Sequence, residues 1–139
     1  MISQENKELL LRDLCGKLPY GVKMNHIADN EHSPKTLIGI AKDMITLVGL
    51  GGYECVDVEH YKPYLFPLSS MTAEQLYELR ELFGFEIEFL NGFIDLSSRS
   101  TLEYLEMIAI IEWFNKNHFD INGLIPMGLA IDCTNLNIY

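Results

Sequence analysis

Two prolines near the middle of the chain, Pro63 and Pro67, set the first limit on its fold. Proline lacks an amide hydrogen and disfavours helical geometry in the residue before it, so residues 61–67 cannot form a helix. The residues before this segment alternate as strands do, whereas those after it show two helix starts. The pattern predicts an α+β fold in which an extended segment separates a β-rich half from a helical half.

The N-terminal residues predict one helix. Apolar side chains recur there at spacings of three and four residues, which makes one stripe along about three turns; they are Leu10, Leu11, Leu14, Cys15 and Leu18. Ser3 is a candidate N-cap, and Gly16 with Pro19 is expected to end the helix. Because Cys15 falls on the stripe, we expect a buried, inert thiol there.

Four short strands are predicted between this helix and the prolines, over residues 20–25, 37–42, 44–50 and 53–59. Lys42-Asp43 is the expected turn of a hairpin. Gly49-Leu50-Gly51-Gly52 suggests a nucleotide-binding loop, but no Gly-Lys-Ser or Gly-Lys-Thr follows, which favours a simple turn. The four strands predict a small antiparallel meander, and an SH3-like curl is left open.

The helical half begins with a capping box. Thr72 and Gln75 have the spacing at which each side chain bonds the other residue's backbone amide, and Met71 can pack on Leu76 across the cap. We expect the helix to bury Leu76, Leu79 and Phe83 and to end at Gly84.

A hairpin and a long helix are predicted next. Asn91-Gly92 between two apolar runs is a strong signal for a two-residue turn, and it pairs Leu90 with Phe93 and Glu88 with Asp95. A second capping box at residues 100–103 begins a helix that extends to about Asn117. This helix is apolar around most of its circumference, which predicts a central position in the core.

The chain's size predicts a single α+β domain over residues 1–139, since 48% of them are hydrophobic. The first residues are polar and lack the pattern of a secretory signal. Cys15, Cys55 and Cys133 are three in number and widely spaced, which favours free thiols in a reducing cytoplasm.

Charge is distributed unevenly along the chain. Residues 1–53 hold six acidic and six basic residues, whereas residues 54–112 hold twelve acidic residues against three basic ones. Such a field disfavours nucleic acid and acidic membranes and favours a basic protein partner. The expected docking residues on the second helix and the hairpin are Glu78, Glu81, Glu86, Glu88 and Asp95; the alternative is that this acidic surface serves solubility alone.

The proline segment adds an aromatic group to this list. Tyr61, Tyr64 and Phe66 lie on a stretch that loses little entropy on docking, so they are candidate partner contacts. The alternative is that the segment straps across its own domain, which would cover these rings.

Catalytic and metal-binding patterns are weak. His26, Asp29, Glu31 and His32 share one loop and could gather around a metal, but solvated polar side chains explain them better. The carboxylates Glu86, Glu88 and Asp95 would need a cleft to act on a substrate. Cysteines 15 and 55 and histidines 60 and 118 lack an activating motif. We therefore predict no catalytic residue, no metal and no cofactor.

Three stretches carry a resemblance to known sequences. They are residues 14–23, residues 62–72 and residues 112–125. Their order resembles that of a group of small uncharacterised proteins encoded in phages and mobile elements of gut bacteria. In that group a basic residue stands where this chain has Phe66. The resemblance implies an accessory role and supplies no catalytic residue.

Together these patterns favour a non-enzymatic cytoplasmic protein that acts through an acidic surface on a basic protein partner. The alternative is a small enzyme or metal-binding protein that uses the loop histidines or the hairpin carboxylates.

Overall fold

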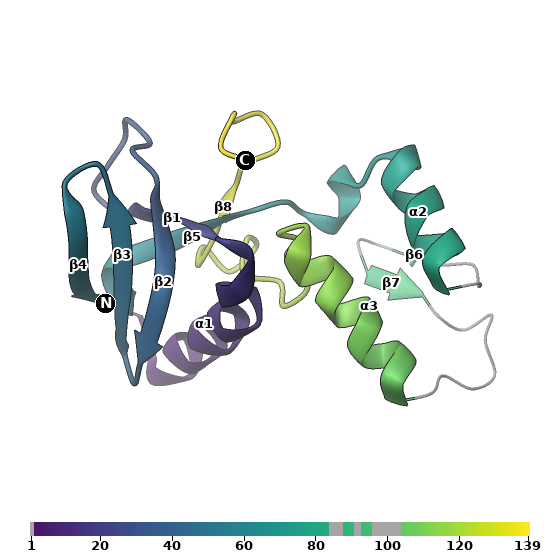
Figure 1. Ribbon diagram of the computed structural model, residues 1–139, viewed down its shortest axis with the longest axis horizontal. Helices are drawn as coiled ribbons and strands as arrows, with labels where there is room; N and C mark the ends of the chain where they lie inside the picture. Colours follow the sequence, from purple (N-terminus) through teal and green to yellow (C-terminus); the bar gives the residue numbers. More distant parts are fainter. Residues whose placement is uncertain (1, 84–87, 91–92, 96–103) are drawn as a thin grey trace.

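The computed structural model describes residues 2–83, 88–90, 93–95 and 104–139, and it has an α+β fold (Figure 1). The N-terminal helix α1 spans Gln4–Lys17. Ser3 caps it as expected, since its Oγ accepts a hydrogen bond from the Asn6 amide at 3.2 Å. A single 3₁₀ turn over Leu18–Tyr20 follows, and Gly21 then adopts a positive φ of 67°.

The predicted meander is present as the first four strands of a six-stranded sheet. These strands are β1 (Lys23–His26), β2 (Lys35–Ala41), β3 (Met44–Gly49) and β4 (Gly52–Asp57). Neighbouring strands pair antiparallel, and Ala41 faces Met44 across the predicted Lys42-Asp43 turn. Gly49 pairs with Gly52 around Leu50-Gly51, so the glycine-rich stretch is a hairpin turn, as expected.

The proline segment is itself a strand of this sheet. β5 (Tyr61–Leu65) pairs antiparallel with β1 on one side and parallel with β8 (Ile131–Asp132) on the other. The strand order is therefore β4-β3-β2-β1-β5-β8. The register places Tyr64 opposite Ile131, so Pro63 lies just before the first pair that β5 makes with β8.

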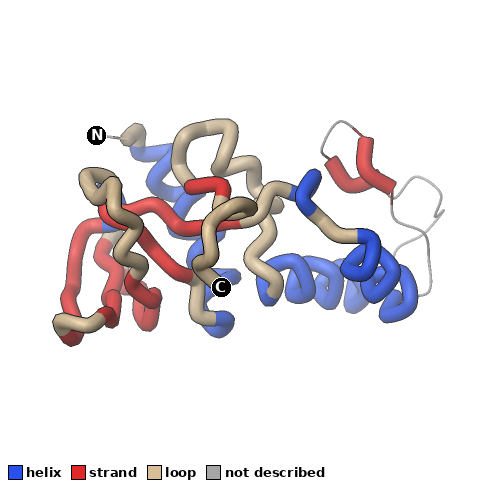
Figure 2. The backbone as a smooth tube through the Cα atoms, turned by 90° about the horizontal axis from the view of Figure 1, so that it is seen from above, coloured by secondary structure: helices blue, strands red, loops and turns tan. Residues whose placement is uncertain are grey.

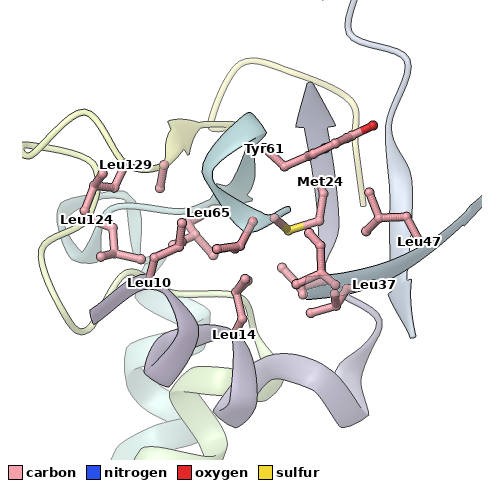
Figure 3. Close-up of a cluster of buried hydrophobic side chains, with 13 residues drawn as sticks. Leu10, Leu14, Met24, Leu37, Leu47, Tyr61, Leu65, Leu124 and Leu129 are labelled. Carbon is pink, nitrogen blue, oxygen red and sulfur yellow. The ribbon is translucent and has the colours of Figure 1, made fainter. Parts of the chain in front are cut away.

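Helix α1 covers one face of the sheet and forms the larger core with it. Leu10 and Leu14 of α1 meet Met24, Leu37 and Leu65 of the sheet (Figure 3). Leu124 and Leu129 from the C-terminal segment close the same cluster. All of these side chains are almost fully buried.

The helical half forms a second, smaller cluster. Helix α2 spans Ala73–Phe83, and helix α3 spans Tyr104–Lys116. Leu79 of α2 packs there with Trp113 and Phe114 of α3 and with Phe119. Figure 2 shows most of the strands at one end of the molecule and these two helices at the other.

The expected capping box of α2 is confirmed. The Thr72 amide donates to Gln75 Oε1 at 3.0 Å, and the Gln75 amide donates to Thr72 Oγ1 at 3.1 Å. The hairpin is confirmed in register: β6 (Glu88–Leu90) pairs with β7 (Phe93–Asp95), and Glu88 lies opposite Asp95. Gly84, the Asn91-Gly92 turn and the second capping box lie outside the described residues.

Two expectations about helix faces are wrong. The buried face of α1 consists of Leu10, Asp13, Leu14 and Lys17, so it is rotated from the predicted stripe and leaves Cys15 exposed. On α3, Ile110, Trp113 and Phe114 are buried, but Met107, Ile108 and Ile111 are exposed. Helix α3 thus covers the second cluster from one side and is not enclosed by it. In the described part of the chain, no helix is long and apolar enough to cross a bilayer.

Candidate functional site

Two acidic residues of β4, Glu54 and Asp57, are paired with lysines of the N-terminal half. Lys35 forms an ion pair with Glu54, which also accepts a hydrogen bond from Tyr61 Oη at 2.9 Å. The lysine is the main reason that the pKa of Glu54 is lowered. Lys7 reaches Asp57 at 3.2 Å, and the Asp57 pKa is lowered chiefly by a hydrogen bond from the Glu59 amide. These carboxylates are therefore already engaged in contacts within the fold.

The acidic residues of α2 are differently placed. Glu74, Glu78 and Glu81 are all exposed, on the side opposite buried Leu79. Within the described residues, none of the three forms a salt bridge. Glu78 Oε1 does lie 3.5 Å from Trp113 Nε1, which links the helix to α3. The carboxylates without an ion pair among the described residues therefore include all three glutamates of α2.

Large apolar side chains share this exposed surface. Tyr77 is 65% exposed and Leu82 is 59% exposed, and both lie on the glutamate side of α2. We call the set Glu74, Tyr77, Glu78, Glu81 and Leu82 the α2 acidic face. Exposed apolar groups surrounded by polar ones are typical of protein-interaction sites. Sequence reasoning found the glutamates but did not include Tyr77 and Leu82.

The other predicted acidic contacts are only partly placed. Glu88 and Asp95 lie opposite each other in the register of β6 and β7. Their side chains, and the whole of Glu86, lie outside the description.

Two of the three aromatic candidates are inside the protein. Tyr61 is 5% exposed, and Tyr64 is fully buried with its hydroxyl 2.7 Å from His32 Nδ1. Burial is also the main reason that the pKa of Tyr64 rises to about 12. Half-buried Phe66 packs against Phe119 and Tyr139. The segment is a strand within its own sheet, and β1 and β8 pair with its two edges. Tyr61 and Tyr64 are therefore not available to a partner.

A small pocket lies beside Phe66. It has a volume of about 230 Å³ and is lined by Phe66, Ser70, Thr72, Gln75, Phe119 and Thr134. None of the lining residues is ionisable, and the Thr72 and Gln75 side chains already bond the α2 cap. The pocket therefore lacks a charged group with which to perform acid–base chemistry.

His26 and Asp29 bond backbone amides of their own loop, whereas His32 contacts Tyr64 of β5. His26 Nδ1 accepts a hydrogen bond from the Ala28 amide at 3.1 Å. Asp29 accepts hydrogen bonds from the amides of Glu31 and Ser33, each at 2.9 Å, and these lower its pKa. Across the residues that the structure describes, no group of three or more potential ligands is placed to hold a metal ion.

The cysteines are all free thiols. Cys15 and Cys55 are exposed, whereas Cys133 is buried and burial raises the pKa of its thiol to about 12. The expectation of a buried Cys15 is wrong because α1 turns a charged pair toward the core in its place.

That charged pair belongs to a polar cluster that sequence reasoning missed. Lys17 Nζ lies 2.7 Å from Asp13 Oδ1 and 3.1 Å from Asn115 Oδ1 of α3. Asn122 Nδ2 donates to the same Asp13 oxygen at 2.8 Å. Both charged side chains are completely buried, and Asp13 Oδ2 has no hydrogen-bond partner among the described residues. The only signal in the sequence is the i, i+4 spacing of Asp13 and Lys17, which usually marks a surface pair.

Comparisons with protein-family models, with curated proteins and with solved structures found no match. Only the fold and the side-chain contacts of the chain therefore bear on its function.

Proposed function

We propose that this chain is a non-enzymatic cytoplasmic protein that binds a basic protein partner through the α2 acidic face. The observation that carries the proposal is the position of Tyr77 and Leu82 among three exposed glutamates without salt bridges among the described residues. Apolar contacts supply binding energy, whereas the glutamates steer and select a partner of opposite charge. The resemblance to small phage and mobile-element proteins supports an accessory role of this kind.

The charge distribution favours a basic partner over other classes. The formal net charge is −10, and the carboxylates of Glu54 and Asp57 are already paired with lysines. A surface with uncompensated glutamates repels phosphate groups and attracts clusters of Lys and Arg. A basic amphipathic segment would place its cations on the glutamates and its apolar side chains on Tyr77 and Leu82.

Photocrosslinking tests where the partner docks. A photoreactive phenylalanine analogue replaces Tyr77 in one variant and Tyr53 in a matched control; Tyr53 is 77% exposed on β4. We expect illumination in cells of the native host to trap one basic protein through position 77 and not through position 53. Equal trapping at both positions, or none at position 77, would contradict the proposal.

Charge reversal then tests the chemistry with the trapped partner. The double variant Glu78→Lys, Glu81→Lys should bind at least tenfold more weakly, and its affinity should depend less on salt. The matched control, Glu8→Lys with Glu31→Lys, makes the same change in net charge at two other exposed glutamates. An equal loss in both double variants would mean that net charge, and not the α2 acidic face, controls binding.

A further inference from the structure

We propose that the buried cluster of Asp13, Lys17 and Asn115 is a site of self-catalysed amide formation, in which Lys17 becomes covalently joined to Asn115 with loss of ammonia. Such a bond would cross-link helix α1 to helix α3. The three groups are the nucleophile, the carboxamide and the proton acceptor that this reaction requires. No oxidant, metal or cofactor is needed, because the reaction exchanges one amide for another.

The nucleophile and the carboxamide are already in contact. Lys17 Nζ lies 3.1 Å from Asn115 Oδ1, and the carbon that would be attacked, Cγ, is bonded to that oxygen. Because this contact already holds the amine and the carboxamide in one buried site, attack on Cγ needs no encounter of free reactants. Gly16 makes this approach possible, since a Cβ atom there would stand 2.7 Å from Asn115 Nδ2. The amide therefore lies directly against α1.

The proton acceptor lies within hydrogen-bond reach of the amine. Asp13 and Lys17 have side chains with no exposed surface, and no hydrogen-bond partner of Asp13 Oδ2 is found in the part of the chain that the structure describes. Two buried charges that are incompletely hydrogen-bonded are costly. Transfer of one proton from Lys17 Nζ to Asp13 Oδ1, 2.7 Å away, leaves a neutral amine and a neutral acid. A desolvated neutral lysine amine is a nucleophile.

The remaining steps conserve every atom and electron pair. The Nζ lone pair forms a bond to Asn115 Cγ while the carbonyl π electrons move to Oδ1. One Nζ proton passes to Nδ2, the Cγ–Nδ2 bond breaks, the carbonyl re-forms and ammonia leaves. Asp13 keeps the proton that it took and is a neutral acid in the product. The reaction thus removes both buried charges, which the ion-paired form retains.

Mass spectrometry of the wild-type protein tests the proposal. We expect folded protein held in mildly alkaline buffer to become lighter by one ammonia and to remain so in denaturant. Trypsin cannot cleave after an acylated Lys17, so the digest should contain residues 13–23 joined to residues 100–116 in one branched peptide. The intact mass given by the sequence, unchanged after prolonged incubation of the folded protein, would overturn the proposal.

Two controls separate this bond from other ammonia losses. Asn91-Gly92 can lose ammonia by forming a succinimide, so a loss that maps there without the branched peptide also overturns the proposal. Asn115→Ala, which removes the carboxamide, should keep the mass given by its sequence. Asp13→Asn keeps the shape of the cluster but removes the proton acceptor; branching at the wild-type rate in this variant would overturn the role given to Asp13.

Discussion

At the scale of single residues, environment decides the chemistry more than residue type does. Cys15 and Cys133 are both cysteines in a chain without disulfides, yet one thiol meets solvent and the other lies in the core. Lys17 and Lys35 are both lysines with a carboxylate partner, yet Lys17 is wholly buried and Lys35 is not. Each difference has a consequence that can be measured.

Thiol labelling should separate the cysteines. Cys15 and Cys55 are exposed, whereas burial of Cys133 raises its pKa to about 12 and keeps the reactive thiolate scarce. We expect a thiol reagent to modify two cysteines quickly in the native protein and all three in denaturant. Peptide mapping identifies them, and fast labelling of Cys133 in the folded state would contradict the structure.

His118 should make stability depend on pH. Its ring stacks on Tyr139 at 3.8 Å between centroids and lies 2.9 Å from the Tyr20 carbonyl oxygen. Burial, the largest influence, lowers its pKa below the ordinary value of 6.5. As pH falls through 6.5, the unfolded chain binds a proton before the folded chain does. The stabilisation by neutral His118 is therefore complete above pH 6.5 and is lost below it.

The measurement is urea denaturation above and below pH 6.5. His118→Asn is a suitable variant because asparagine tolerates the positive φ of 61° at this position. We expect the variant to lose less stability on acidification than the wild type does. Identical pH dependence in the two proteins would mean that His118 is not the group responsible.

At the scale of helices and strands, features that depend on residues close in the sequence could be predicted better than features that depend on contacts between distant residues. Thr72, Gln75 and the Lys42-Asp43 turn act through neighbours in the sequence, so their positions could be predicted. The two-residue strand β8 could not, because it exists only through pairing with β5. The buried face of α1 was missed for the same reason: Asp13 and Lys17 form hydrogen bonds with Asn122 and Asn115, which lie far along the chain.

The α2 cap offers a test at this scale. Thr72→Val removes the hydroxyl that accepts from the Gln75 amide while keeping the side chain's shape. We expect a loss of about 1 kcal/mol in the free energy of unfolding. Ser69→Ala removes an exposed hydroxyl three residues earlier and should change stability little. Equal effects of the two substitutions in urea denaturation would argue against the capping box.

At the scale of the whole molecule, the charge imbalance limits what the protein can bind. The net charge is −10, and three exposed glutamates line one side of α2. Duplex DNA binding depends on neutralising phosphates with lysine and arginine. The charge imbalance is evident from the sequence. Only the structure shows that Glu54 and Asp57 are paired with lysines, whereas the glutamates of α2 form no salt bridge among the described residues.

We therefore expect no submicromolar binding to duplex DNA at physiological salt. Fluorescence anisotropy with a labelled duplex measures this. A change in anisotropy that weakens steeply as salt rises would reveal phosphate contacts and contradict the expectation.

The position of β5 has a consequence for synthesis of the protein. A nascent chain that has emerged as far as Leu65 can pair β5 with β1, but the other side of β5 must wait for residues 131–132. Tyr139 emerges later still, and its hydroxyl then accepts a hydrogen bond from the Lys23 amide and donates one to the Tyr64 carbonyl. Until then, the growing polypeptide carries an open strand edge to which a chaperone or a second nascent chain can add.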